Sequence, residues 1–323
     1  MVFGLFSKKW NPDGKHVYIT GGSSGLGLSL AQILATKGAN ISIVARNQGK
    51  LDSALESLEA LRVSKNQFFK VYSHALQPGS AAVAALELVS EPYGGDAPDA
   101  VFTCAGSSKP MFFVEMEERD LVDGMNNAYW LQAWTAWGAS FHFSCAASKK
   151  MVKQNKKGTK IVLVSSTLGY MSFLGWASYS PGKHALRGLA DTLHSELLLY
   201  NIDVHIYFPA TMYTPGFDEE NKTKPEIVRK IESADEGVTA DQAAQALYKG
   251  VESGRAHITG DLITSLFSAS TRGATYRHNW LLEGLFDMVA FIAIPIWRSS
   301  VDKQVVAHRE EHQQYLEKNG FFS

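Results

Sequence analysis

The sequence has little cysteine and no surplus of either charge. It contains two cysteines in 323 residues, Cys104 and Cys145, which lie far apart in the chain. Two distant thiols make neither a disulfide framework nor a metal cluster, so we expect a reducing compartment and no metal site. Lys and Arg number 31 and Asp and Glu 32, which gives a net charge of −1. This balance argues against a nucleic-acid partner.

Long uninterrupted apolar runs are also missing. Residues 280–297 are rich in Leu, Phe, Ile, Val and Trp, but Glu283 and Asp287 interrupt them, and the unbroken run at residues 288–297 has ten residues. A helix that spans a bilayer needs about 20 apolar residues. The segment is therefore too short, or too charged at its start, to predict a span, and it could lie in a membrane interface or pack on the main domain. The residues at its ends that suit an interface are Trp280, Trp297 and Arg298.

A signal peptide is not indicated at the N-terminus. Such a peptide begins with basic residues followed by a longer apolar run. Residues 1–10 instead begin apolar and then carry Lys8 and Lys9. We therefore expect an N-terminal extension over residues 1–14.

Between the two ends, short apolar strands alternate with helical patterns. The expected strands are 16–20, 41–45, 68–72, 100–104, 160–164 and 204–208. The expected helices are 26–37, 47–61, 82–88, 126–152 and 183–200. This alternation predicts an α/β protein of the Rossmann type, with a doubly wound parallel sheet and helices on both faces. We predict a single domain over residues 15–260, followed by an apolar, membrane-associated or packed segment over residues 261–323.

A glycine-rich turn, Thr-Gly-Gly-Ser-Ser-Gly-Leu-Gly at residues 20–27, follows the first strand and opens the first helix. Gly21 permits a tight turn, Gly25 lets the backbone approach a pyrophosphate, and Gly27 lets the helix pack close to the sheet. The helix N-terminus offers free N–H groups and a positive dipole end to phosphates. The pattern predicts a dinucleotide site that includes Ser23 and Ser24, and the alternative is a flexible glycine turn.

The second strand ends in Ala-Arg-Asn at residues 45–47, with no acidic residue. A site for NAD usually places Asp or Glu there to accept a hydrogen bond from the ribose 2′-OH. Arg46 can instead bind a 2′-phosphate through its planar guanidinium, helped by Lys50 and Ser23. We therefore expect NADPH rather than NADH, and the alternative is a solvated surface arginine.

Ser166, Tyr179 and Lys183 form the predicted catalytic set. Ser166 lies just past the expected strand 160–164, and Tyr179 and Lys183 are one helical turn apart. Reduction of a ketone needs a hydride, which NADPH supplies, and a proton, which a tyrosine can supply. The Lys183 ammonium would lower the pKa of the tyrosine toward neutrality and hydrogen-bond the cofactor ribose, while Ser166 would hydrogen-bond the substrate oxygen.

Taken together, these motifs resemble the short-chain dehydrogenase/reductase family over about residues 15–260. The glycine turn and the Tyr-x-x-x-Lys at residues 179–183 match it, with the serine thirteen residues before the tyrosine. The family's Asn-x-Ala-Gly appears as Thr-Cys-Ala-Gly at residues 103–106, and its later Pro-Gly appears as Pro-Ala at residues 209–210. Further cofactor contacts that the resemblance implies are Ala105, Gly106, Pro209 and Thr214.

Two departures from the family pattern stand out. The Asn that the family places early in the fifth helix aligns with Ala128. Either the helix is shifted and Asn127 serves as the fourth catalytic residue, or the proton relay is altered. The acid that the family places after the third strand is absent, and His74 in that segment is expected to be a loop residue rather than a catalyst.

Residues 213–226 resemble the substrate-side loop of reductases that act on a long-chain keto-lipid in sphingolipid synthesis. That resemblance implies an enzyme at the endoplasmic reticulum membrane with its active site toward the cytosol. Two alternatives stay open: a reductase of another apolar carbonyl, such as a steroid or retinoid, and an NADPH-binding regulator without turnover, which only Ala128 supports.

An aromatic series recurs at helical spacing in the long expected helix. The series is Trp130, Trp134, Trp137 and Phe141. Such a series fits either the core or a subunit interface, and the family resemblance favours a homodimer through the long helices.

Overall fold

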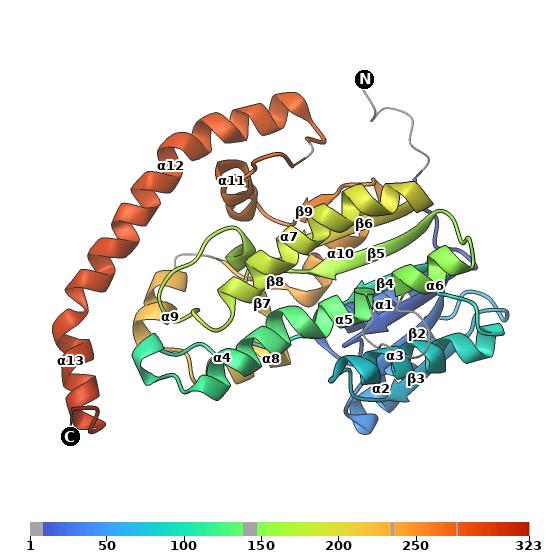
Figure 1. Ribbon diagram of the computed structural model, residues 1–323, viewed down its shortest axis with the longest axis horizontal. Helices are drawn as coiled ribbons and strands as arrows, with labels where there is room; N and C mark the ends of the chain where they lie inside the picture. Colours follow the sequence, from blue (N-terminus) through green and yellow to red (C-terminus); the bar gives the residue numbers. More distant parts are fainter. Residues whose placement is uncertain (1–8, 138–146, 234–235, 276, 323) are drawn as a thin grey trace.

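The computed structural model describes residues 9–137, 147–233, 236–275 and 277–322, and its centre is a seven-stranded parallel sheet (Figure 1). The strand order is β3-β2-β1-β4-β5-β6-β9. The strands are β1 (His16–Thr20), β2 (Asn40–Ala45), β3 (Phe69–Ser73), β4 (Ala100–Thr103), β5 (Thr159–Val164), β6 (Ile202–Phe208) and β9 (His257–Thr259). The predicted Rossmann-type fold is confirmed, because the order reverses at β1 and every pairing in this sheet is parallel.

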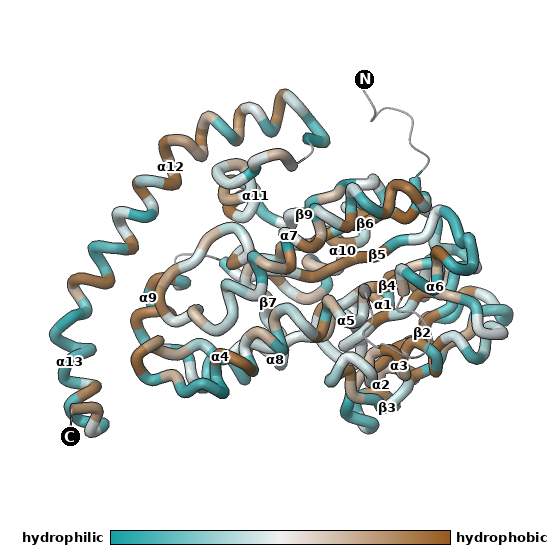
Figure 2. The backbone as a smooth tube through the Cα atoms, in the orientation of Figure 1, coloured by the Kyte–Doolittle hydropathy of each residue, from teal (hydrophilic) through white to brown (hydrophobic). Residues whose placement is uncertain are grey.

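Helices cover both faces of the sheet. One face packs on α1 (Gly25–Thr36), α2 (Gln48–Ala60) and α10 (Ala240–Glu252), and the other on α3 (Gly79–Ser90), α5 (Leu131–Trp137), α6 (Ala147–Lys153) and α7 (Ser180–Leu197). Side chains of successive residues in β1 lie on opposite faces of the sheet: Val17 and Ile19 belong to the first core, and Tyr18 belongs to the second. Both faces are buried, so the strands are apolar almost throughout, as the brown colour of β5 and β6 in Figure 2 shows.

The prediction of one regular helix over residues 126–152 is wrong, because the helix begins earlier and is interrupted by a π-helical turn. Helix α4 (Glu118–Met125) already begins at residue 118, because the side chains of Glu117 and Asp120 form a reciprocal cap. A π-helical turn, η3 (Asn126–Trp130), joins α4 to α5. A short parallel pair, β7 (Met212–Tyr213) and β8 (Val238–Thr239), lies outside the main sheet and was also not predicted. His74 lies in the loop after β3, as expected.

The C-terminal segment forms a longer helix than its apolar run predicts. After α11 (Leu262–Ser270), helix α12 (Trp280–Ala307) has 28 residues, and α13 (Arg309–Lys318) follows it. The expectation that the segment is too short to span is wrong, because the helix continues past Trp297, and by length and composition α12 could cross a membrane. In Figure 1, α12 runs as a long arch from α11 past α9 (Glu226–Glu232) to α13.

Candidate active site

The glycine turn after β1 has no room for side chains at two positions. Gly21 has a φ of +70°, and a Cβ there would lie 2.8 Å from the backbone of Ala105. A Cβ on Gly27 would lie 2.6 Å from the Gly21 carbonyl oxygen. Gly25 has a φ of +53° and begins α1, so the free N–H groups of that helix start at the turn. This backbone cradle fits the pyrophosphate of a dinucleotide.

A hollow of about 500 Å³ adjoins the turn and extends between α1 and α2. It is lined by Ser23 and Ser24 from the turn and by Asn47 and Lys50 from the start of α2. Arg46 directly precedes this lining and is exposed. The structure thus brings the predicted serines and Lys50 together. It adds Asn47, which the motif did not single out and which also caps α2 by accepting a hydrogen bond from the Lys50 N–H at 2.9 Å.

Pro209 and Thr214 come from the segment after β6 and reach the same region. The Thr214 side chain lies beside the turn, because a Cβ on Gly25 would be 3.3 Å from its methyl group. The Pro209 carbonyl oxygen accepts a hydrogen bond from the Thr167 N–H at 3.0 Å, which joins this segment to the loop after β5. The predicted residues, which come from the loops after β1, β2, β4 and β6, therefore gather at the carboxyl ends of the parallel strands.

Ser166, Tyr179 and Lys183 lie where β5 ends and α7 begins. The Ser166 Oγ accepts a hydrogen bond from the Leu168 N–H at 3.2 Å. The Lys183 Nζ lies 5.3 Å from the centre of the Tyr179 ring and donates a hydrogen bond to the Val164 carbonyl oxygen at 2.9 Å. The predicted set is thus brought together by one strand end and one helix start.

Burial controls the protonation of this set. It lowers the pKa of the Lys183 ammonium from 10.5 to about 7, because the charged form loses its hydration. Burial also raises the pKa of Tyr179, the charge of Glu220 raises it further, and a hydrogen bond with Ser166 opposes both. Lys183 is not among the causes that act on the tyrosine pKa here, and desolvation of the phenolate is the largest of them. The tyrosine is therefore protonated at neutral pH, the form that a proton donor needs, although burial makes it a weaker acid. The lowering of this pKa by Lys183 stays a prediction.

The π-helical turn η3 brings Asn127, the predicted fourth catalytic residue, near the site. The Asn127 carbonyl oxygen lies 3.4 Å from where a Cβ on Gly106 would stand. Ala128 is buried, and its Cβ lies 2.7 Å from where a Cβ on Gly182 would stand, directly before Lys183. The backbone at Asn127 therefore faces the end of β4, while Ala128 packs on α7. The catalytic role of Asn127 stays a prediction.

A buried glutamine that the sequence did not single out connects α5 to two strands. The Gln132 side chain accepts hydrogen bonds from the Thr103 hydroxyl at 2.8 Å and from the Val164 N–H at 2.9 Å. Its amide donates to the Val164 carbonyl oxygen at 2.7 Å. Thr103 stands where the family has Asn, so the Thr–Gln pair holds the ends of β4 and β5 together. No local motif marks Gln132, because its partners are about 30 residues away in the chain.

The aromatic series is only partly described. The Trp130 and Trp134 rings stack with their centres 5.6 Å apart, and 40% of Trp130 is exposed. Trp130 therefore lies at the surface rather than in the core. The side chain of Trp137 and all of Phe141 lie outside the described residues, as does Cys145.

Comparison with known proteins gives consistent matches. The short chain dehydrogenase family matches residues 15–225. The chain is 41% identical over its full length to a 3-ketodihydrosphingosine reductase of Cryptococcus neoformans, of which it covers 93%. It is 33% identical to the enzyme of that name from Aspergillus fumigatus, over 88% of this chain and 82% of the relative. The corresponding reductase of Dictyostelium discoideum is 31% identical over 81% of this chain and 79% of its own.

Solved structures share the fold. A short chain dehydrogenase/reductase of Burkholderia phymatum in complex with NAD superposes with a TM-score of 0.66 at 20% identity, over 78% of this chain and 90% of the other. A short-chain type dehydrogenase/reductase of Mycobacterium ulcerans superposes with a TM-score of 0.65 at 19% identity, over 77% of this chain and 89% of the other.

Proposed function

Because the chain belongs to the short chain dehydrogenase family, we propose that it reduces 3-ketodihydrosphingosine to dihydrosphingosine with NADPH, and that Tyr179 donates the proton. The substrate is proposed from the 41% identity, over the whole chain, with a reductase named for this ketone. The placement of Ser166, Tyr179 and Lys183 together at the end of β5 and the start of α7 supports the reaction.

Each residue of the set has a distinct task. When bound, NADPH supplies the hydride. Tyr179 gives its phenolic proton to the ketone oxygen, and it is protonated at neutral pH, as a proton donor must be. Ser166 donates a hydrogen bond to the same oxygen, where negative charge develops. Lys183 is anchored by the Val164 carbonyl oxygen and would hold the ribose of the cofactor. Asn127 is the proposed fourth member of the set.

The choice of NADPH rests on the end of β2. No acidic residue stands at residues 45–47, so nothing there repels a 2′-phosphate. The exposed Arg46 and the Lys50 side chain beside the hollow offer two positive charges at this point. The glycine turn would hold the pyrophosphate, with Ala105, Gly106, Pro209 and Thr214 around it.

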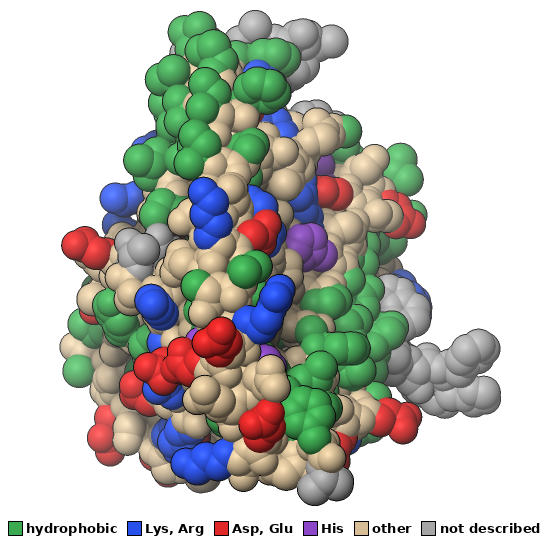
Figure 3. Space-filling view, turned by 90° about the vertical axis from the view of Figure 1, so that its left-hand side faces the viewer, with side chains coloured by type: hydrophobic (Ala, Val, Ile, Leu, Met, Phe, Trp, Pro, Cys, Tyr) green, Lys and Arg blue, Asp and Glu red, His purple; other side chains and the backbone are tan. Residues whose placement is uncertain are grey.

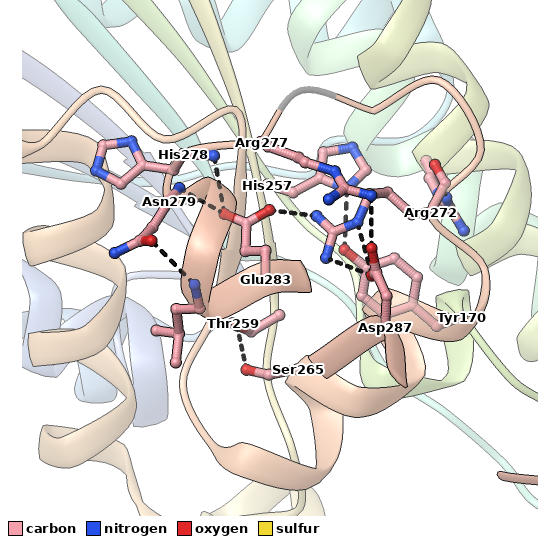
Figure 4. A network of polar contacts seen from close by, with 12 residues as sticks. Tyr170, His257, Thr259, Ser265, Arg272, Arg277, His278, Asn279, Glu283 and Asp287 are labelled. Atoms are coloured by element: carbon pink, nitrogen blue, oxygen red, sulfur yellow. Dashed lines mark hydrogen bonds and ion pairs between the residues drawn. The ribbon is translucent and has the colours of Figure 1, made fainter. Parts of the chain in front are cut away.

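Both acidic residues that interrupt the apolar C-terminal segment face the protein. Glu283 pairs with Arg272, and Asp287 lies 2.5 Å from Arg277 and 3.3 Å from Arg272. Figure 4 shows this network between the α11–α12 connection and the first turns of α12. The charges that argue in the sequence against a membrane span are thus paired with arginines on the inner side of the helix.

The outer side of α12 is apolar and exposed. The exposed fractions of Leu281 and Phe291 are 89% and 82%. Other exposed apolar residues of the helix are Trp280, Leu285, Met288, Ile292 and Ile296. Figure 3 shows hydrophobic side chains gathered at the top of this view, where α12 begins in Figure 1. The inner side is held to the domain, because Trp297 packs on Phe267 of α11 and Val301 is buried near α9.

A helix held along one side to a water-soluble domain, with its other side apolar, fits an in-plane position in a membrane interface rather than a span. We infer that α12 occupies this position at the endoplasmic reticulum membrane, with the active site toward the cytosol. A long-chain ketone could then reach the site without leaving the bilayer entirely, which avoids a cost of about 0.8 kcal/mol for each CH₂ exposed to water.

We also infer a homodimer through the helices that carry Trp130 and Trp134. Their stacked rings leave apolar aromatic surface exposed, which a second copy would cover. Size measurement by light scattering should give a dimer for the protein and a monomer for Trp130→Ser.

The test of the reaction is a substrate panel. Purified protein in detergent or vesicles would receive NADPH and 3-ketodihydrosphingosine, a ketosteroid or retinal, and consumption of NADPH would be followed. We expect turnover with the sphingoid ketone to exceed the others by at least about 100-fold, since binding of the wrong substrate shape loses several kcal/mol. A preference for the steroid or retinal would overturn the proposed substrate. NADPH binding without turnover of any of these carbonyls would indicate a regulator.

A further inference from the structure

A nearly buried cluster of charges lies beside the proposed proton donor. The Lys224 Nζ lies 2.7 Å from the Glu220 Oε1 and 2.6 Å from the Glu232 Oε2. Only 1% of the Lys224 side chain is exposed, against 17% for Glu220 and 19% for Glu232. Two carboxylates therefore share one ammonium group at a site that is largely shielded from water.

Ring contacts and a hydrogen bond connect this cluster to the active site. The Lys224 Nζ lies 5.3 Å from the centre of the Trp176 ring, and the Trp176 and Tyr179 ring centres are 5.7 Å apart. The second oxygen of Glu220, Oε2, accepts a hydrogen bond from the hydroxyl of Ser108, two residues beyond Gly106 in the loop after β4. Glu220 thus contacts that loop, and its charge contributes to the raised pKa of Tyr179.

The cluster is short of positive charge. Burial raises the pKa of Glu232 even though the Lys224 ammonium touches it, and the charge of Glu220 raises it further. A carboxylate offers about four acceptor positions, and Lys224 and Ser108 occupy two on Glu220. A further cation near Glu220 would balance the second carboxylate.

We propose that Glu220 binds the ammonium group of the substrate and selects ketones that carry an amine on the neighbouring carbon. This inference rests on the proposed function, because 3-ketodihydrosphingosine has its amine on the carbon next to the carbonyl. With the ketone oxygen at Tyr179, that amine is two bonds from the reacting carbon, close enough for a carboxylate near the tyrosine to bind it, and the charge of Glu220 acts on Tyr179. Lys224 holds the Glu220 carboxylate in position, and Glu232 in turn pairs with Lys224. Glu220 is therefore a residue that determines specificity, while Lys224 positions it.

The test compares Glu220→Gln with the wild-type protein on two ketones. The first is 3-ketodihydrosphingosine, and the second is the same long-chain hydroxyketone without the amino group. The substitution keeps the shape of the side chain and can still accept a hydrogen bond from Ser108, but it removes the charge. Glu219→Gln is the matched control, because Glu219 is exposed and pairs only with its neighbour Lys222 among the ion pairs of the described chain.

For the wild-type protein we expect kcat/KM to favour the amino ketone by about 10- to 100-fold, the scale of one hydrogen bond to a charged group. Glu220→Gln should lose most of this preference by lowering activity on the amino ketone alone, while Glu219→Gln keeps it. The KM of the wild-type protein for the amino ketone should also rise as the pH passes the pKa of the substrate amine, and this rise should be absent in Glu220→Gln. A merely structural role would lower activity on both ketones equally.

The proposed reaction and the proposed role of Glu220 can be overturned separately. If the wild-type protein does not reduce the amino ketone, the proposed function is wrong. If it does, and Glu220→Gln retains the preference and the pH dependence of KM, the role of Glu220 is wrong while the reaction stands. A Glu220→Gln protein that does not fold would be replaced by Glu220→Asp, which keeps the charge at a shorter reach and should retain the preference with a raised KM.

Discussion

At the scale of single residues, the proton donor is the first to test. Tyr179→Phe keeps the ring that packs on Trp176 but removes the phenolic proton. We expect turnover to fall by about 100-fold or more, the scale of a lost general acid, with NADPH affinity unchanged. Stopped-flow or steady-state kinetics and cofactor titration would measure both. Tyr200→Phe, an exposed tyrosine beyond α7, is the control and should leave turnover intact. Turnover of Tyr179→Phe within a few fold of the wild type would remove the tyrosine from this role.

The lowered pKa of Lys183 makes the free energy of unfolding depend on pH. Its pKa in the folded protein is about 7 rather than 10.5, so unfolding takes up a proton between these pH values. The free energy of unfolding should therefore rise with pH from about 7 toward 10.5, since the unfolded state binds more protons in that window. Lys183→Met should be inactive, lack this rise, and be more stable at neutral pH by on the order of 5 kcal/mol, because the pKa falls from 10.5 to about 7 and each pKa unit is worth about 1.4 kcal/mol.

Denaturant unfolding at a series of pH values would measure this dependence. The wild-type and Lys183→Met curves should converge as the pH approaches 10.5. Parallel curves over the whole range would show that the buried lysine keeps its ordinary pKa.

Arg46 decides the cofactor in our proposal. Removing its guanidinium with Arg46→Ala should weaken NADPH far more than NADH, because only NADPH has the 2′-phosphate. A charge-assisted contact is worth about 1.5–3 kcal/mol, so the preference for NADPH should shrink by roughly 10- to 100-fold. Titrations with both cofactors give the ratio directly. Equal weakening of both would mean that Arg46 serves the structure of the β2–α2 connection.

At the scale of elements, Gln132 holds α5 against β4 and β5. Gln132→Leu fills the same space but leaves the Val164 N–H without its partner. A buried donor without a partner costs about 1–3 kcal/mol, so the free energy of unfolding should fall by about 2 kcal/mol. Gln313→Leu on the exposed side of α13 is the control and should stay within about 0.5 kcal/mol of the wild type. A neutral Gln132→Leu would show that water or a shifted backbone replaces the bridge.

At the scale of the whole molecule, α12 connects the catalytic domain with a membrane. Phe291→Glu puts a charge at the centre of the exposed apolar side without touching the inner contacts. Loss of one buried aromatic side chain is worth about 1.5–3 kcal/mol, so binding to liposomes should weaken by about 10-fold or more. Activity on the long-chain ketone in vesicles should fall with it, while activity on a short soluble analogue survives.

Flotation of liposomes with bound protein measures this effect, and Gln313→Glu, which adds the same charge away from the apolar side, is the control. Unchanged binding of Phe291→Glu would show that α12 does not sit in the membrane. Point changes are preferable to removal of the helix, because Trp297 and Val301 belong to the packed interior and truncation would expose it.

The sequence by itself determined the parts of this protein that depend on neighbours in the chain. Alternating apolar strands and helical patterns predict the parallel sheet, because the spacing of apolar residues that marks each element can be recognised within about a dozen neighbouring residues. The glycine turn at residues 20–27 and the Tyr-x-x-x-Lys at residues 179–183 are likewise local motifs, whose spacing already brings their residues to one turn or one helix face.

Tertiary structure alone decided what depends on partners far apart in the chain. Three such features are the Gln132 bridge, the position of the Glu220–Lys224 pair near Tyr179, and the inward-facing Glu283. Each depends on a contact with another segment of the folded chain. The pKa of Tyr179 rises for the same reason, because burial is a property of the folded chain and not of the motif. In α12, the charges that appear in sequence to break an apolar run face inward and leave the outer side apolar, since helical geometry separates residues that are adjacent in the chain.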